Sequence, residues 1–416
     1  MVTAKPFDIS KQEVWDAYKR VKANRGAAGV DDQSIAEFEA DLPNNLYKLW
    51  NRLVSGSYFP PPVRQVEIPK ETGGVRMLGI PTVADRIAQS VVKARLEPVL
   101  EPLFHADSYG YRPGRSALDA VGAARQRCWR SNWVLDLDIK AFFDSIDTEL
   151  LMRAVCKHAT SRWEVLYIER WLKAPVQMPD GTIVARTRGT PQGGVISPLL
   201  ANLFLHYAFD VWMTRHFPAV RFERYADDAI CHCASEEQAT TLWRALVERF
   251  AECGLTLHPE KTKIVYCKDS ERPGDYPCQT FDFLGYTFRP RLAKDRYGRC
   301  FVSFTPAASG KALKAIRQTV RHWRLHRRSD KTLSDLARMF NPMIRGWIAY
   351  YSKFRHSALF PTLKHIDHYL VRWVCGKYKR FRGHQQRARQ WLDCVAKREP
   401  ALFAHWTLIR RGAAAG

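Results

Sequence analysis

The sequence predicts an α+β fold that continues into an all-helical, strongly basic region, and three observations indicate this. Up to about residue 290, short segments with strand-like alternation are interspersed with segments of helical periodicity. Beyond a short β segment, "FVSFTP", the rest of the chain has helical patterns only. The net charge changes at the same place. With 416 residues, 46% of them hydrophobic, the chain is long enough for two or three domains with their own cores.

The charge of +23 is concentrated in the last third of the chain. From Arg291 onward there are 28 Lys and Arg residues against 6 Asp and Glu, a net +22, whereas residues 1–290 hold 37 against 36. Any one short basic run is explained equally well by a solvated face. Cations interleaved with many aromatic residues, however, are typical of a surface that binds phosphates and stacks bases. These aromatic residues are Trp323, Trp347, Tyr350, Tyr351, Trp373, Tyr378, Phe381 and Trp391.

The N-terminal third begins with a helical pattern over residues 11–23, followed by a Gly-rich basic loop, "NRGAAGVDD", and a helical segment that runs to about Trp50. The stretch "YFPPPVRQVEIPKETGGVRMLGIPT" predicts two strands joined by a turn at Thr72-Gly73-Gly74. No apolar run reaches membrane-spanning length, and the N-terminus lacks the apolar segment of a signal peptide. The sequence therefore predicts a cytoplasmic protein without a membrane partner.

Two strand-like segments carry carboxylates at unusual places. In "NWVLDLDIKAFFDSID", Asp138 follows a strand on the same face as Val134 and Asp136. In "FERYADDAICHC", Asp227 and Asp228 interrupt a strand, and a tight hairpin there would let the two side chains converge. An ordinary hairpin tip is the alternative interpretation, because Asp is common in turns.

The later elements are marked by capping signals. Ser197 and Pro198 predict the N-cap and the first residue of a helix. Ser235-x-x-Gln238 predicts a capping box that opens a helix ending at Gly254. In the basic region, Asn341-Pro342 predicts the start of another helix.

If the two carboxylate segments meet, they form an oxygen-rich site that suits Mg²⁺ rather than zinc. Ten cysteines are scattered without a Cys-x-x-Cys pair, and Cys231-His232-Cys233 alternates faces on a strand, so buried free thiols are the better interpretation. Two metal ions held by Asp138, Asp227 and Asp228 would suit in-line nucleotidyl transfer, which is polymerase chemistry.

These motifs together resemble the group II intron-encoded reverse transcriptases, also called maturases, over nearly the entire chain. "YADD", "LDLDIKAFFDSI" and "RGTPQGGVISPLLANLFL" are similar to the family's polymerase motifs, and they are accompanied in the family's order by "GVRMLGIPTVADRIAQ", "GYRPGRSALDAV", "LTLHPEKTKI", "FDFLGYTF" and "NPMIRGWIAYYSKF". The resemblance implies a right-hand polymerase, with fingers and palm in residues 1–298, an α-helical thumb in 299–366 and a basic nucleic-acid-binding region in 367–416.

The resemblance also implies roles for individual residues. Asp138, Asp227 and Asp228 would bind two Mg²⁺ ions, and Phe143 would lie under the sugar as a gate against a 2′-hydroxyl, with a core Phe as the alternative. The residues implied to contact substrates are Lys70 and Arg76 at the triphosphate, Gln192 at the nucleotide or template, Lys261 near the site, and Phe283, Leu284 and Gly285 as a primer grip. For Arg86, Arg112 and Arg115, salt bridges or RNA-backbone contacts are at least as well supported.

The implied function is an RNA-directed DNA polymerase that also binds its intron RNA to assist splicing and mobility. Its other implied partners are an RNA template, a DNA primer or target and dNTPs. "RGAAGVD" resembles the family's template-cradling extension, and nothing after Trp391 offers the His and paired Cys residues of the endonuclease domain that many members carry. Two alternatives remain, a maturase that acts mainly by binding RNA and a domesticated reverse transcriptase in defence or DNA repair. The sequence does not indicate an oligomeric state.

Overall fold

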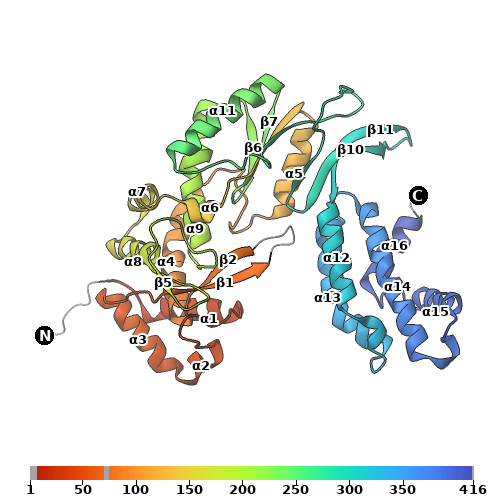
Figure 1. The fold of residues 1–416 in the computed structure, drawn as a ribbon, viewed down its shortest axis with the longest axis horizontal. Helices are drawn as coiled ribbons and strands as arrows, with labels where there is room; N and C mark the ends of the chain where they lie inside the picture. Colours follow the sequence, from red (N-terminus) through yellow and green to blue (C-terminus); the bar gives the residue numbers. More distant parts are fainter. Residues whose placement is uncertain (1–6, 70–74, 415–416) are drawn as a thin grey trace. The chain divides into compact units, whose positions relative to one another are not determined.

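The computed structural model describes residues 7–69 and 75–414, and the chain divides into two compact units (Figure 1). The first unit comprises residues 1–116 and 135–263, and the second comprises residues 117–134 and 264–416. Both helices and strands are present, which confirms the predicted mixed composition. Among the described residues, no helix combines the length and apolar composition that a membrane span requires.

The first unit is mainly helical, with short strands between the helices. Its helices are α1 (Lys11–Ala23), α2 (Ile35–Ala40), α3 (Leu42–Ser55), α4 (Val83–Leu100), α6 (Phe142–Ser145), α7 (Thr148–His158), α8 (Arg162–Lys173), α9 (Ser197–Leu205), α10 (Val211–His216) and α11 (Glu236–Glu252). Helix α4 is almost entirely buried over its first ten residues and packs against α1, α3, α7, α8 and α9, so it forms the centre of this unit.

The strands between residues 63 and 266 form two four-stranded sheets. One has the order β2-β1-β4-β5 and is built from β1 (Val63–Pro69), β2 (Val75–Ile80), β4 (Val176–Gln177) and β5 (Ile183–Val184). Strands β1 and β2 are antiparallel as predicted, and the predicted turn at Thr72-Gly73-Gly74 lies outside the described residues.

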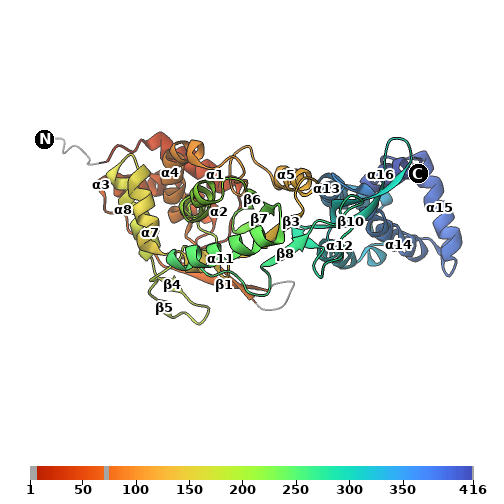
Figure 2. The ribbon, with the colours of Figure 1, turned by 90° about the horizontal axis from the view of Figure 1, so that it is seen from above.

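The other sheet has the order β6-β7-β3-β8 and is built from β3 (Trp133–Leu137), β6 (Arg221–Tyr225), β7 (Asp228–Cys233) and β8 (Lys263–Tyr266). Helix α11 runs beside the β6–β7 pair (Figure 2). Cys231 and Cys233 are buried free thiols on β7, and burial raises the pKa of Cys233 to about 12. Both thiols are therefore protonated at neutral pH, as expected for core residues.

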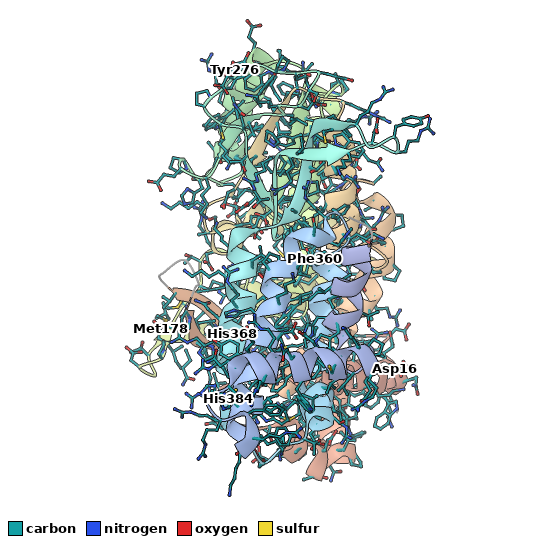
Figure 3. All side chains as sticks on the ribbon, turned by 90° about the vertical axis from the view of Figure 1, so that its right-hand side faces the viewer. Asp16, Met178, Tyr276, Phe360, His368 and His384 are labelled. Atoms are coloured by element: carbon teal, nitrogen blue, oxygen red, sulfur yellow. The ribbon has the colours of Figure 1, made fainter. Side chains whose placement is uncertain are left out.

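The second unit combines a three-stranded sheet of order β11-β10-β9 with a helical region. The strands are β9 (Phe281–Phe283), β10 (Tyr286–Lys294) and β11 (Cys300–Ala308), and the helices are α5 (Ala117–Cys128), α12 (Gly310–His322), α13 (Leu333–Tyr351), α14 (Phe360–Lys377), α15 (Gln385–Arg398) and α16 (Ala404–Ala414). Figure 3 marks Phe360 and His368 on α14 and His384 before α15. One hydrophobic core runs from Ile316 to Trp406 and includes residues of all five helices from α12 to α16.

Two predicted helix starts are wrong. Pro342 lies inside α13, which begins with a capping box at Thr332. Asn341 is buried, and its side chain donates to the Leu402 carbonyl and accepts from the Ala404 amide. Similarly, the N-cap of α9 is Ile196, and the Ser197 hydroxyl accepts from Thr190 instead of capping the helix. The Ser235 cap is confirmed, since its side chain accepts from the Gln238 amide.

Candidate active site

The adjacent Asp227 and Asp228 lie at the tip of the β6–β7 hairpin. Tyr225 and Asp228 pair across the two strands, so the turn consists of Ala226 and Asp227 alone. Ala226 has a φ of 57°, a conformation that non-glycine residues rarely adopt. The predicted tight hairpin is therefore confirmed, and it holds its first turn residue in a strained conformation of the kind that clusters at functional sites.

A buried polar network holds this turn in place. Arg224 donates through Nε and Nη2 to the two carboxylate oxygens of Asp210, at 2.7 and 2.6 Å. Its Nη1 donates to the Ala226 carbonyl and to the Asn202 side-chain oxygen, both at 3.0 Å. Both charged side chains are 1% exposed. Because a buried ion pair of this kind tolerates little displacement, it fixes the carbonyl that immediately precedes Asp227.

The hairpin is also held from its other side by the chain at Gly110. A Cβ atom on Gly110 would lie 2.4 Å from the Ala226 amide nitrogen. Asn202, the partner of Arg224, donates to the Gly110 carbonyl at 2.7 Å. Only glycine allows this close approach of two backbones. Sequence reasoning missed the Arg224 network, since its members come from four separate segments with no shared spacing.

Asp138 follows β3, the strand next to β7 in the sheet, so its carboxylate and those of Asp227 and Asp228 come from neighbouring strands. The Asp138 backbone is fixed by the His258 amide, which donates to its carbonyl at 2.7 Å. Lys261 donates from Nζ to the Asp138 carboxylate at 2.9 Å. The structure thus places Lys261, which the resemblance only loosely linked to the site, in direct contact with a proposed metal ligand.

Burial and the charge of Asp138 both affect the protonation of Asp227 and Asp228. Desolvation by the surrounding protein, followed by repulsion from Asp227 and Asp138, raises the pKa of Asp228 to about 7. Desolvation also raises the pKa of Asp227, and the charge of Asp138 adds to this effect. Arg76 and Lys261 act in the opposite direction on Asp228. Concentrated negative charge of this kind favours a bound cation.

The donor chemistry fits a divalent metal ion, although the side chains do not form a closed cage. Among the described residues, no group of three or more His, Cys, Asp or Glu side chains is assembled tightly enough to hold an ion. Mg²⁺ is commonly bound by one or two carboxylates together with water and substrate phosphates rather than by protein ligands alone. An open arrangement of carboxylates is therefore compatible with a metal that binds together with a nucleotide.

The Gly-rich segment after Arg188 packs closely against β2. The Gly79 amide donates to the Gln192 carbonyl at 2.6 Å, so Gln192 is fixed beside the strand that carries Arg76. Gly193 has a φ of 114°, and a Cβ atom there would lie 2.4 Å from the Gly79 carbonyl oxygen. The backbones of Gly193 and Gly79 thus approach each other too closely for a side chain at position 193.

A second buried network anchors the same segment from α4. The Gln89 side-chain oxygen accepts from the amides of Val195 and Ile196, at 2.8 and 3.3 Å. Its amide group donates to Asp85, which also accepts from Tyr58 and Trp171. Burial raises the pKa of Asp85 to about 6 against the opposing effect of these donors. Sequence reasoning missed this network, because α4 also carries Arg86, Ser90, Lys93, Arg95 and Glu97, so the i, i+4 spacing of Asp85 and Gln89 does not single them out.

Phe143 differs from its neighbour Phe142 in its surroundings. Phe142 is 2% exposed and belongs to the core, whereas Phe143 is only half-buried. The Phe143 carbonyl accepts from the Thr190 amide at 2.8 Å, which ties α6 to the Gly-rich segment. Phe143, five residues after Asp138, is therefore less buried than Phe142, and its role as a gate stays a prediction.

The structure describes only one of the two cations predicted to flank the β1–β2 turn. Lys70 lies outside the described residues, and Arg76 is exposed on β2. Arg76 is close enough to lower the pKa of both Asp227 and Asp228. The structure therefore brings Arg76 into the electrostatic surroundings of the carboxylates.

The predicted primer-grip residues belong to the second unit, where they form a tight hairpin between β9 and β10. Leu284 and Gly285 make the turn with φ values of 50° and 78°, as a two-residue hairpin requires. The Leu284 carbonyl accepts from the Tyr350 hydroxyl at 2.7 Å. Phe283 is 2% exposed. Tyr286 donates to the Tyr350 carbonyl, so the hairpin is fixed to helix α13.

Three further arginines, Arg86, Arg112 and Arg115, contact other parts of the protein. Arg112 is buried and donates to the Glu101 carboxylate and to the carbonyls of His105 and Ser108. Arg86 donates to the Ala27 carbonyl and thereby holds the Gly-rich basic loop. Arg115 lies over the Tyr109 ring at 5.8 Å. The salt-bridge interpretation is confirmed for Arg112, whereas Arg86 supports the loop through a backbone contact.

Comparison with known proteins is consistent with this geometry. Residues 68–288 match the family model described as reverse transcriptase (RNA-dependent DNA polymerase). Residues 313–391 match the group II intron, maturase-specific domain. Protein YkfC of Escherichia coli is 31% identical over 332 residues, which make up 70% of this chain and 83% of YkfC.

The group II intron-encoded protein LtrA of Lactococcus lactis subsp. cremoris is 34% identical over 193 residues, 46% of this chain and 32% of LtrA. The putative COX1/OXI3 intron 1 protein of Saccharomyces cerevisiae is 29% identical over 201 residues, 47% of this chain and 23% of that protein. This chain thus spans about a third or less of these two intron-encoded relatives. It belongs to the group II intron reverse transcriptase and maturase family, whose enzymes are RNA-directed DNA polymerases.

Proposed function

We propose that the protein extends a DNA primer on an RNA template with dNTPs, and that Asp138, Asp227 and Asp228 hold two Mg²⁺ ions for this reaction. The observation that supports this most directly is the set of carboxylates on neighbouring strands, with the pKa of Asp228 raised to about 7 by its surroundings and by Asp227 and Asp138. A structural role alone would not require these carboxylates to lie together against mutual repulsion.

The bound ions would polarise the primer hydroxyl and stabilise the charge of the departing pyrophosphate. Lys70 and Arg76 would hold the triphosphate, and Lys261 would restrain Asp138. Gln192 would contact the incoming nucleotide or the template. Phe143 would lie under the sugar and reject a 2′-hydroxyl by steric clash. Residues assigned to gripping the primer are Phe283, Leu284 and Gly285.

We assign the parts of the polymerase to residue ranges from the resemblance to the family. We assign fingers and palm to residues 1–298, a thumb to 299–366 and a basic nucleic-acid-binding region to 367–416. Intron RNA would bind to the basic last third, which carries a net +22 from Arg291 onward and overlaps the maturase-specific match. We also propose that the protein works in the cytoplasm.

A second candidate is a maturase that acts mainly as an RNA-binding splicing cofactor. The maturase-specific match over residues 313–391 supports it, and the retained carboxylates at Asp138, Asp227 and Asp228 favour the enzyme. A domesticated reverse transcriptase in defence or repair would keep the same site. A search for a catalytic intron RNA next to the gene would distinguish this domesticated role from the intron-linked roles.

The test of the proposed function is primer extension by the purified protein on an RNA template with Mg²⁺ and dNTPs. We expect labelled cDNA from the parent protein and a loss of about 1,000-fold or more in Asp227→Ala, because losing a metal ligand removes several kcal/mol of transition-state stabilisation. Synthesis by Asp227→Ala within a few-fold of the parent would contradict the metal assignment.

A further inference from the structure

A surface pocket of the second unit is lined by three arginines. The pocket has a volume of about 420 Å³, and Arg289, Arg291, Arg355 and Ser357 contribute its polar lining. Arg289 and Arg291 lie on β10, and Arg355 immediately precedes the short 3₁₀ turn His356–Leu359. The resemblance to known polymerases assigns no role to these four residues.

The strand pattern explains why the arginines converge. Positions 289 and 291 are two apart on β10, so their side chains leave the same face of the sheet. Beyond Phe288, β9 no longer pairs with β10, and Pro290 stands where the strand has an open edge. Arg355 reaches this strand through Nη1, which donates to the Leu292 carbonyl at 3.1 Å.

Two of the guanidinium groups are held by backbone carbonyls. Arg291 donates from Nε to Thr305 at 3.2 Å and from Nη2 to Thr287 at 2.9 Å. Arg355 is held by its bond to Leu292. Arginine has five N–H donors, so these bonds leave donors for a ligand. Because the side chains are already ordered, a ligand would not have to offset the full entropy of fixing them.

The electrostatics of the pocket favour an anion. Burial, followed by repulsion from Arg289 and Arg355, lowers the pKa of Arg291 to about 10. Arg291 remains charged at neutral pH, so three cations lie together in the pocket, with Arg291 and Arg355 half-buried and Arg289 exposed. An oxyanion between them would relieve this repulsion, and the planar guanidinium fork matches phosphate oxygens.

The composition of the lining identifies the part of a ligand that it would bind. Among the described residues that line the pocket, none is aromatic, and the apolar lining consists of Pro290, Leu292 and Ala358. Stacking of a base normally uses an aromatic ring. A site with three guanidiniums, one hydroxyl and no ring is therefore suited to a phosphate group rather than to a nucleoside.

We propose that Arg289, Arg291 and Arg355 form a binding site for one phosphodiester group of a nucleic-acid strand. The proposal rests on the proposed function and deepens it, because it assigns one backbone contact to a defined pocket instead of to the basic surface in general. A free phosphate compound offers the same chemistry, and the experiment below distinguishes the two sources.

The experiment measures binding of a short RNA–DNA hybrid to the full-length protein by fluorescence anisotropy at several salt concentrations. The main variant is Arg289→Gln, because Arg289 is exposed and its loss leaves the backbone contacts of Arg291 and Arg355 intact. Arg355→Gln is the second variant. Lys294→Gln removes the same charge from an exposed position on the same strand outside the pocket and is the matched control.

We expect each pocket variant to weaken hybrid binding by about tenfold, as the loss of a charge-assisted hydrogen bond does. The slope of log affinity against log salt should fall by about 1, while Lys294→Gln stays within about twofold of the parent. A scan with single uncharged methylphosphonates should find one linkage whose replacement weakens the parent but not Arg289→Gln.

Other outcomes overturn the proposal in distinguishable ways. If the parent binds the hybrid and the pocket variants match Lys294→Gln, the pocket does not contact nucleic acid, while the proposed function stands. If these variants also lose stabilisation by inorganic phosphate in thermal melts, the pocket serves a free phosphate compound instead. If the parent itself fails to bind the hybrid, the proposed function fails together with this inference.

Discussion

Phe143 is the residue whose proposed role depends most directly on its surroundings. It is half-buried and lies in the segment that follows Asp138, whereas Phe142 beside it fills the core. In Phe143→Ala, the space under the sugar opens, so we expect discrimination against ribonucleotides to fall by about tenfold or more, as for other steric pockets. Competition between dNTPs and rNTPs in primer extension measures this.

Phe143→Tyr is the control, because it keeps the ring. It should discriminate as the parent does. An unchanged preference for dNTPs in Phe143→Ala would remove Phe143 from the role of gate.

Asp85 makes stability depend on pH in a predictable direction. Burial raises its pKa from the ordinary 3.8 to about 6, so folding favours the neutral form. This contribution to the free energy of unfolding is fully present below about pH 4 and is lost as the pH rises through about 6. Asp85→Asn lacks this titration. Between pH 5 and 8 the parent should therefore lose on the order of 1 kcal/mol relative to Asp85→Asn.

Urea unfolding of both proteins across this pH range measures the difference. The direction in which the stability difference changes with pH tests the role of burial at Asp85. A parent that gains stability relative to Asp85→Asn as the pH rises would mean that the three donors to Asp85 outweigh its desolvation.

The β6–β7 hairpin is the element on which the site depends, and the Arg224–Asp210 pair anchors it. Arg224→Met removes a buried guanidinium and leaves Asp210 without its partner, which typically costs about 3–5 kcal/mol of unfolding free energy. Equilibrium unfolding in denaturant measures this loss. Arg221→Met removes a charge from an exposed position on the same strand and should change stability by less than about 0.5 kcal/mol. Equal effects of the two substitutions would show that the network does not support the turn.

The same elements show what sequence alone could predict. The hairpin at Asp227 and Asp228 follows from interrupted alternation, and the Ser235 cap follows from local spacing, because both depend on nearby residues. The helix start at Asn341 was wrong because the capping box of Thr332 and Asp335, a local signal, begins α13 nine residues earlier and Pro342 lies inside the helix. The Arg224–Asp210 pair could not be predicted, since a tertiary contact between two separate elements decides it.

On the scale of the whole molecule, the dominant feature is that the excess positive charge and the three carboxylates of the candidate site lie in different parts of the sequence. The net +22 begins at Arg291, while Asp138, Asp227 and Asp228 lie in a part of the chain that is nearly neutral. RNA affinity should therefore fall steeply with salt, with a slope of about 0.7 to 0.9 for each phosphate neutralised. A filter-binding titration over a range of salt concentrations measures this slope.

A matched pair of triple variants tests where the charge acts. One replaces Arg382, Arg387 and Arg389, which are exposed at and before α15, by Gln. The other replaces Arg153, Arg162 and Lys173, which are exposed on α7 and α8. Only the first triple variant should reduce the RNA affinity and the slope of its salt dependence. Equal losses in both would mean that RNA is bound by net charge alone.

The most direct test of the account measures cDNA synthesis and RNA affinity in the same Asp227→Ala protein, with thermal melts to confirm its fold. We assign Asp227 to metal binding, and it does not belong to the basic last third, so its loss should remove stabilisation of the reacting oxygens and leave phosphate contacts unchanged. We expect synthesis to fall by about 1,000-fold or more while RNA affinity stays within about twofold of the parent. A correctly folded Asp227→Ala protein that loses RNA binding as severely as synthesis would contradict the division between a carboxylate site for polymerisation and a basic C-terminal third that holds RNA.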